Sequence, residues 1–226
     1  MRPWLAVPRS LEALNALARA RDVRTASGRA VQFVAPAETT GYYEVSVYDT
    51  GRVATRPENL HDWFNALAWL AFPQAKARIN AMHAARIPLE GGRRGRLRDL
   101  LTLFDEGGAL VICADAQLVA LLQAARWREL FWDRRDDVRR SMRILVFGHA
   151  VLEQALSPWP GITCKALCLA SGERLDADTA AWLAALTADA SPKALPSVPI
   201  FGYPGWMAAD SSAFYEDRRY FRVPKA

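Results

Sequence analysis

The segment Asn59-Leu60-His61-Asp62-Trp63-Phe64-Asn65 marks the start of a helix and gathers polar and aromatic side chains in a short stretch. Asparagine is a preferred N-cap residue, and an acid three residues later, Asp62, interacts favourably with the helix dipole. Apolar residues at helical spacing predict a helix from Leu60 to about Ala71. Pro73 can then open a second helix as its first residue, running to about Ala85.

The residues before this segment predict a β-hairpin. Tyr42 to Tyr48 alternates Tyr, Glu and Val, as a half-buried strand does. Asp49-Thr50-Gly51 is typical of a hairpin turn, and Arg52 to Thr55 would return as the second strand. Further upstream we expect an amphipathic helix from Ser10 to about Arg21 and a strand over 30–34.

The second half of the chain repeats one pattern, an apolar strand followed by a break and a helix. Continuous apolar strands that alternate with helices indicate a parallel sheet covered on both faces. We therefore predict a mixed α/β fold, with an N-terminal helix and a β-hairpin–helix unit joined to a short, mainly parallel sheet with flanking helices. The strand and helix pairs are 109–113 with 115–125, 143–147 with 149–156, and 163–169 with 176–187.

A chain of 226 residues suits one large domain. We expect a single domain over residues 1–226. Its parts would be an N-terminal helix and linker (1–29), the hairpin with two helices (30–90), the strand–helix repeats (91–190) and an irregular C-terminal segment (191–226).

Composition bounds the environment and the partners. The chain has 29 basic and 24 acidic residues, so a net charge of +5 permits binding of nucleic acid or phosphate without demanding it. Its three cysteines are an odd number in apolar surroundings, which argues against a disulfide framework. No apolar run approaches the roughly 20 residues that span a bilayer. We expect a cytoplasmic protein without a membrane segment; its oligomeric state is left open.

The helix start is the first candidate site. His61 and Asn65 lie one turn apart and share a face, with Asp62 beside them. These three residues are candidates for catalysis, and a histidine with a carboxylate after a hairpin resembles the layout of ββα metal nucleases. Their general base comes from the hairpin, however, and this hairpin has no histidine. The alternative is that Asn59 and Asp62 cap the helix, while His61 and Asn65 make buried hydrogen bonds.

Gly148-His149, with Glu153 one turn later, is the second candidate. His149 would follow a parallel strand at its carboxyl end, where ligands of open α/β sheets bind, and Asp115 would lie at the same edge. His149 and Glu153 could form a base and its orienting acid, or share a metal. The alternative is that His149 caps the start of the helix and Glu153 lies in its first turn.

Cations and acids surround these candidates. The loop Gly91–Arg96 offers glycine amides and arginine forks before a helix, which suits an anion. Its alternative is a mobile basic surface loop. Lys76, Asn80 and His83 form a polar stripe that we expect to face solvent. The substrate-binding candidates are Arg56, Arg96, Arg98 and Asp99, and the candidate metal ligands are Asp105 and Glu106.

No nucleophile elbow, dinucleotide fingerprint, His-Glu-x-x-His or Cys-x-x-Cys motif is present.

The sequence resembles a known family in the stretch from Thr55 to Pro73, in Phe147-Gly148-His149, in Pro204-Gly205-Trp206 and in Phe221-Arg222. This family is bacterial, mostly proteobacterial, and is known as a domain of unknown function, number 3025. The resemblance covers about residues 43–222. It implies no activity, cofactor or catalytic residue.

Two functions remain as hypotheses. The first is a hydrolase-type enzyme, with a divalent metal as a candidate cofactor, acting on an anionic small molecule or phosphoester. His61 or His149 would act as base or ligand. The second is a non-enzymatic adaptor or nucleic-acid-associated protein that uses the arginines of residues 93–98, whose binding should fall steeply with salt.

Overall fold

The computed structural model describes residues 8–39 and 41–223. By internal contacts the chain divides into two compact units. The helical unit comprises residues 1–105 and 176–191, and the sheet unit comprises residues 106–175 and 192–226. The two units alternate along the sequence, and the expectation of a single domain stays a prediction.

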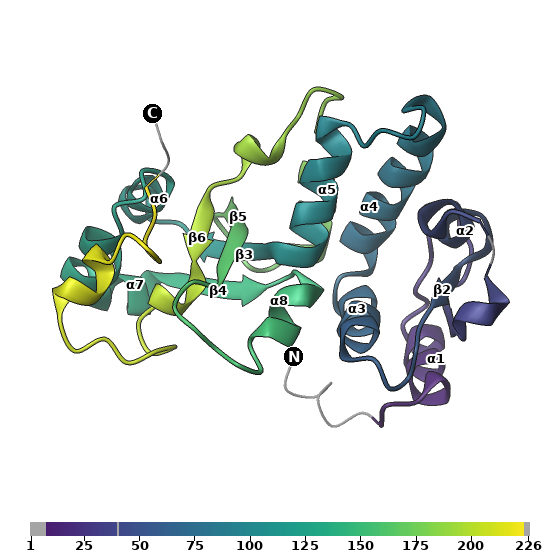
Figure 1. The fold of residues 1–226 in the computed structure, drawn as a ribbon, viewed down its shortest axis with the longest axis horizontal. Coiled ribbons are helices and arrows are strands. Elements are labelled where there is room, and N and C mark those ends of the chain that lie inside the picture. Colours follow the sequence, from purple (N-terminus) through teal and green to yellow (C-terminus); the bar gives the residue numbers. More distant parts are fainter. Residues whose placement is uncertain (1–7, 40, 224–226) are drawn as a thin grey trace. The chain divides into compact units, whose positions relative to one another are not determined.

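The helical unit holds a two-stranded sheet and most of the helices (Figure 1). Its strands β1 and β2 are parallel, with Phe33 opposite Val53. A short 3₁₀ turn follows β1 and another follows α4. The elements are α1 (Leu11–Ala20), β1 (Gln32–Val34), α2 (Tyr43–Thr50), β2 (Arg52–Ala54), α3 (Leu60–Ala71), α4 (Pro73–Arg86), α5 (Arg96–Gly107, up to Asp105) and α9 (Leu175–Ala184, from Asp176).

The predicted hairpin is wrong, because its first strand is helix α2. Val47 on this helix is fully buried, and Gly51 ends the helix in the left-handed region at φ 77°. A Cβ on Gly51 would lie 2.2 Å from the Ala30 carbonyl oxygen, so this helix end requires glycine. Parallel strands cannot be joined by a tight turn, and α2 supplies the crossover between β1 and β2.

Helix α3 follows the prediction in its bounds and in its cap. The side-chain oxygen of Asn59 accepts a hydrogen bond from the Asp62 backbone N–H at 2.9 Å. Its apolar face is buried, including Trp63, Phe64 and Leu70. The cap and the apolar spacing are local signals, which explains why the sequence was sufficient to predict them.

The sheet unit is built on four strands in the order β4-β3-β5-β6 (Figure 1). All six residues of the central strand β3 are buried. An aromatic cluster that includes Trp127, Phe131, Tyr215 and Phe221 packs in the same core. The elements are β3 (Gly108–Cys113), α6 (Ala116–Gln123), a π-helical turn (Glu129–Asp133), α7 (Arg135–Ser141), β4 (Met142–Val146), α8 (His149–Gln154), β5 (Thr163–Leu169) and β6 (Ser197–Pro199).

The mixed α/β class is confirmed, but one strand runs against expectation. β3 and β5 are parallel, whereas β4 is antiparallel to β3. The helix α7 between α6 and β4 was not predicted. It delivers the chain to the edge where β3 ends, so that Met142 pairs with Cys113. Within the described residues, no helix is long and apolar enough to cross a membrane.

Candidate functional site

The polar stripe of α4 is buried, contrary to the prediction that it faces solvent. The exposed fractions of Lys76, Asn80 and His83 are 3%, 2% and 4%. Lysine is almost never buried to this degree without a partner, because removing an ammonium group from water is costly. Burial of these three side chains therefore requires polar partners inside the helical unit.

Lys76 has three neighbours that compensate for its burial. Its Nζ lies 2.5 Å from Oδ1 of Asp105 on α5 and donates to Oδ1 of Asn65 on α3 at 2.8 Å. It also lies 5.7 Å from the centre of the Trp69 ring, within cation–π range. Asn65 in turn donates through Nδ2 to the Tyr43 hydroxyl oxygen at 3.2 Å. These contacts link α2, α3, α4 and α5 through one chain of polar groups.

A second buried pair joins α2 to α4. Nδ2 of Asn80 donates to Oε2 of Glu44 at 2.6 Å and to the Glu44 backbone carbonyl at 2.8 Å. One amide thus fixes both the backbone and the carboxyl group of Glu44. The buried Oδ1 of Asn80 has no hydrogen-bond partner among the described residues. It is an acceptor within a polar cluster, which makes it available to a donor from water or substrate.

These side chains line one small cavity. Its volume is about 20 Å³, and its walls come from both polar groups described above. A cavity of this size accommodates about one water molecule, provided that polar partners surround it. We call this set the Glu44 cluster. Its lining residues are Tyr43, Glu44, Asn65, Trp69, Lys76, Ile79, Asn80 and Asp105.

Burial changes the proton affinity of two groups in the Glu44 cluster. It raises the pKa of Glu44 to about 7, against the opposing effect of the hydrogen bond from Asn80. The nearby charges are Asp105, which also raises this pKa, and Lys76 and Arg98, which lower it. Burial, and next the charge of Glu44, raise the pKa of Tyr43. At neutral pH the cluster therefore holds a carboxyl group poised between its two protonation states and a neutral phenol.

His83 extends the polar stripe toward the basic loop. Its Nδ1 accepts a hydrogen bond from Nε of Arg98 at 3.3 Å, and Arg98 also pairs with Glu90 at 3.1 Å. Burial, and next the charge of Arg98, lower the pKa of His83 to about 4. His83 is thus a neutral acceptor at pH 7, rather than a cation.

Two of the predicted site residues belong to the Glu44 cluster, Asn65 and Asp105. The Arg56 guanidinium instead pairs with Asp62 at 2.7 Å, which holds the pKa of Asp62 below its usual range although burial opposes this. This pair fixes the start of α3. His61 is half-buried one turn before Asn65.

The remaining candidates of α5 are dispersed around the helix. Arg98 contacts His83, whereas Arg96 is exposed and Asp99 is half-buried. Glu106 is exposed and belongs to the sheet unit. Among the described residues, no group of three or more His, Cys, Asp or Glu side chains is arranged to hold a metal ion. Asp105, a predicted metal ligand, is engaged by the Lys76 ammonium.

His149 and Glu153 lie in the sheet unit, on the six-residue helix α8. His149 is 4% exposed. Because β4 is antiparallel, its carboxyl end lies beside the beginning of β3, and the Gly148 N–H donates to the Gly108 carbonyl at 2.8 Å. Asp115 follows the other end of β3, so the expectation that Asp115 and His149 share a sheet edge is wrong.

Four polar residues of the Glu44 cluster were not predicted as site residues: Tyr43, Glu44, Lys76 and Asn80. Tyr43 and Glu44 were assigned to a strand, and the other two to a solvated face. A signal was present in the spacing, since residues 76, 80 and 83 share one face of a helix. The spacing alone does not predict a site, because tertiary packing decides whether that face of the helix is buried.

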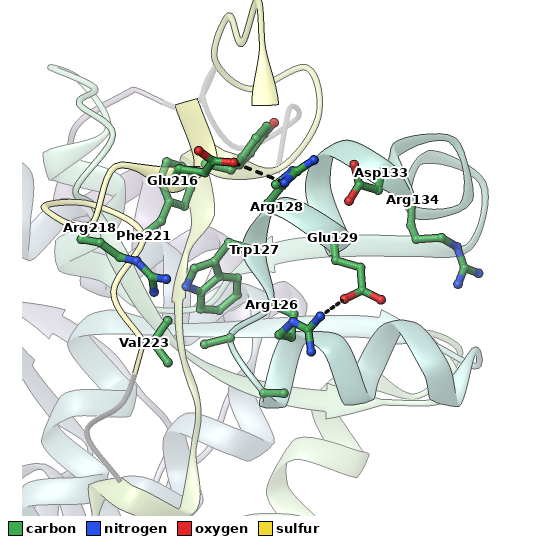
Figure 2. A pocket seen from close by; sticks show the side chains of 13 residues that line it. Arg126, Trp127, Arg128, Glu129, Asp133, Arg134, Glu216, Arg218, Phe221 and Val223 are labelled. Atoms are coloured by element: carbon green, nitrogen blue, oxygen red, sulfur yellow. Dashed lines mark ion pairs between the residues drawn. The ribbon is translucent and has the colours of Figure 1, made fainter. Parts of the chain in front are cut away.

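The sheet unit carries a much larger cavity, of about 970 Å³, between the π-helical turn and the C-terminal segment (Figure 2). Arginines and acids alternate around it. Arg126 pairs with Glu129 at 2.7 Å and Arg128 with Glu216 at 3.4 Å, as the dashed lines in Figure 2 mark. These charges neutralise each other at its rim, so we regard the Glu44 cluster as the stronger catalytic candidate.

Comparison with known proteins identifies the family of this chain. The family described as a protein of unknown function (DUF3025) matches residues 31–225, from before β1 to the C-terminal segment. The match confirms the resemblance inferred from the sequence. None of the curated proteins and none of the solved structures matches the chain significantly.

Proposed function

We propose that this chain, which belongs to the DUF3025 family, is a hydrolase-type enzyme whose catalytic centre is the Glu44 cluster. One observation carries the proposal: a carboxyl group with a pKa of about 7 shares a cavity of about one water molecule with a buried ammonium group. Strongly shifted groups that converge in a cavity are typical of catalytic sites. This assignment replaces the histidines of the sequence hypothesis with Glu44.

Glu44 is the general base. A base works best when its pKa lies near the operating pH, because it is then both available and strong enough to accept a proton. The Glu44 carboxylate would take a proton from a water molecule in the cavity while the water oxygen attacks the phosphorus atom of the ester. The bond from phosphorus to the leaving oxygen then breaks, and the protonated Glu44 returns its proton to that oxygen. The free Oδ1 of Asn80 can accept the second hydrogen of that water and orient it.

Lys76 and Tyr43 would stabilise the negative charge that develops in the transition state. Fixed charges in a site shielded from water act more strongly than in solvent. The Lys76 ammonium is held in place by Asp105 and Asn65. The Tyr43 oxygen accepts from Asn65, so its own proton is free to donate to a substrate oxygen. Tyr43 lines the cavity, and although its hydroxyl group is buried, the residue as a whole is 40% exposed.

The proposed substrate is an anionic ester, such as a phosphoester. The Glu44 cluster itself has no excess positive charge, because Asp105 and Glu44 offset Lys76. The anionic group would therefore bind on the basic loop, through Arg94, which acts electrostatically on His83, and the exposed Arg96. No metal ligand set is part of this proposal. We place the enzyme in the bacterial cytoplasm, where free cysteines such as those of this chain stay reduced.

A panel of chromogenic esters tests the proposal. It comprises p-nitrophenyl phosphate, bis(p-nitrophenyl) phosphate and p-nitrophenyl acetate, each assayed with and without Mg²⁺ or Mn²⁺. We expect the wild-type protein to hydrolyse at least one phosphoester. The rate should fall more than about 100-fold in Glu44→Gln and should stay at the wild-type value in the exposed control Glu58→Gln. A wild-type protein that hydrolyses none of them, or equal rates for both variants, would contradict the proposal.

A binding role for the basic loop is the second candidate. Arg93, Arg94 and Arg96 are exposed and form no ion pair with described residues. Such arginines suit the phosphates of nucleic acid. Binding of a labelled single-stranded oligonucleotide should then weaken steeply between 50 and 200 mM salt, roughly in proportion to the number of phosphate contacts. Affinity that does not change with salt, or is retained in Arg93→Gln/Arg94→Gln, would exclude this role.

A further inference from the structure

A second cavity of the sheet unit lies where its parallel strands end. Its volume is about 470 Å³, within the range of small-molecule pockets. Three segments meet there: the end of β3 at Ile112 to Ala114, the residues 170–173 after β5, and the end of α7 with the start of β4, which contribute Arg140, Ser141 and Arg143. The carboxyl ends of neighbouring parallel strands are where open α/β sheets bind ligands.

Arg143 is the central cation of this cavity. It stands opposite Ile112 in the register of β3 and β4, so both side chains emerge on one face of the sheet. The Arg143 side chain is exposed and has no ion-pair partner among the described residues. Its planar fork is thus available to an oxyanion, whose geometry it matches.

The absence of a side chain at Gly172 leaves room for the Arg143 guanidinium. A Cβ on Gly172 would lie 2.9 Å from Nη2 of Arg143 and 3.2 Å from Cδ1 of Ile112. The end of the Arg143 side chain and the Ile112 side chain therefore both lie close to position 172. A side chain at position 172 would displace the guanidinium, although the backbone there is not in the left-handed region.

Other polar groups complete the cavity. Ser141 and Ser171 bring hydroxyl groups, and the Ser171 Oγ accepts from the Glu173 N–H at 3.3 Å. Arg140 adds a second guanidinium, which is engaged by Asp137 on α7. Glu173 is the one acid among the lining residues. Its carboxylate repels a bound anion, so replacing Glu173 by a neutral residue should strengthen anion binding.

We infer that this cavity binds a phosphate group on the Arg143 guanidinium, with Arg140 and the two serines around it. The inference concerns a site in the sheet unit and is independent of the proposed hydrolase function. The larger cavity of Figure 2 is a weaker candidate, because Glu129 and Glu216 already neutralise two of its arginines.

Isothermal titration of the full-length protein with inorganic phosphate and with phenyl phosphate tests the site. We expect a dissociation constant below 1 mM for at least one of them, roughly tenfold weaker binding in Arg143→Gln and in Gly172→Ala, and tighter binding in Glu173→Gln. The control Arg139→Gln removes an exposed arginine that does not line the cavity, and should bind within twofold of wild type. Circular dichroism checks that each variant is folded.

The two ligands separate the sources of the phosphate group. Phenyl phosphate binding tighter than phosphate identifies a phosphomonoester, whereas phosphate binding as tightly or more tightly identifies free phosphate, and both results support a phosphate site. Absence of binding to both ligands overturns the inference, as does an unchanged affinity in Arg143→Gln. Because binding is measured directly, a protein that hydrolyses no ester but binds phosphate at Arg143 would contradict only the proposed function.

Discussion

Nδ2 of Asn80 lies 2.6 Å from Oε2 of Glu44 and 2.8 Å from the Glu44 carbonyl oxygen. This contact holds the carboxyl group of one helix against the buried polar face of another. Because the hydrogen bond favours the ionised carboxylate, it opposes the effect of burial, which raises the pKa to about 7. The account of the catalytic centre depends on that balance.

Removing the hydrogen bond should move the balance in one direction. In Asn80→Leu, a group of similar size cannot donate, so the pKa of Glu44 should rise above its wild-type value. The acid limb of any pH–rate profile should shift upward with it. The exposed substitution Gln74→Leu, on the same helix, serves as control. A pKa of Glu44 that falls or does not move would show that Asn80 does not act on the carboxyl group.

The buried ion pair should be costly to break. The side chains of Lys76 and Asp105 are 4% and 15% exposed, so Lys76→Met leaves a carboxylate with its principal cation removed. We expect a loss of about 3–5 kcal/mol in the free energy of unfolding, measured with urea. The exposed pair of Arg24 and Asp22 is the matched control, since Arg24→Gln breaks an ion pair that solvent screens and should cost far less than Lys76→Met. Equal costs for the two would mean that burial does not strengthen the Lys76 pair.

Stability should depend on pH in opposite ways through Glu44 and His83. Glu44 has a raised pKa in the folded state, so between its ordinary value and about 7 the folded protein binds the extra proton, and its contribution to stability is lost as pH rises. His83 has a lowered pKa, so between about 6.5 and 4 the unfolded chain binds the extra proton, and stability is lost as pH falls. The two effects offset each other near pH 5–6.

Single variants separate these effects. Relative to wild type, Glu44→Gln should gain stability as pH rises from about 4.5 to 7, by roughly 1.4 kcal/mol per pH unit at most. His83→Gln should gain it as pH falls from 6.5 to 4. Denaturant melts at half-unit intervals of pH provide the measurement. Differences from wild type that are flat with pH would contradict the assigned shifts.

The cap of α3 gives a prediction that concerns stability alone. Asn59→Ala removes the acceptor of the Asp62 N–H and should cost about 1 kcal/mol, whereas Asn59→Asp should retain most of the stability. Chemical denaturation of the two variants compares them directly. An unchanged free energy of unfolding in Asn59→Ala would mean that another acceptor replaces the Asn59 side chain.

The sequence was most informative where structure is local. The bounds of α3 and its cap were predicted because an N-cap residue, an apolar stripe and a proline all lie within fifteen residues. α2 was missed because the alternation of Tyr43 to Tyr48 also fits a strand, and a segment of eight residues is too short for periodicity to decide. Gly51 was assigned to a hairpin turn, whereas its left-handed backbone ends helix α2.

Long-range features could not be predicted in this way. The direction of β4 follows from α7, which the sequence analysis did not detect, and strand direction has no local signature. Similarly, Lys76 and Asn80 carry residue types that usually face water, and only the packing of α2 and α5 against α4 buries them. For the same reason Asn65 and Asp105, far apart in the sequence, were proposed separately and meet around one ammonium group.

The pKa of Glu44 is the quantity that tests the central claim most directly. Carbon-13 NMR of the full-length protein, labelled at the side-chain carboxyl of glutamate, follows this group from pH 3 to 9, and its signal is assigned by its loss in Glu44→Gln. We predict a titration midpoint near 7 for Glu44 and ordinary midpoints for exposed glutamates such as Glu58. A midpoint between 4 and 5 would show that Glu44 is an ordinary carboxylate, and would contradict its role as the general base.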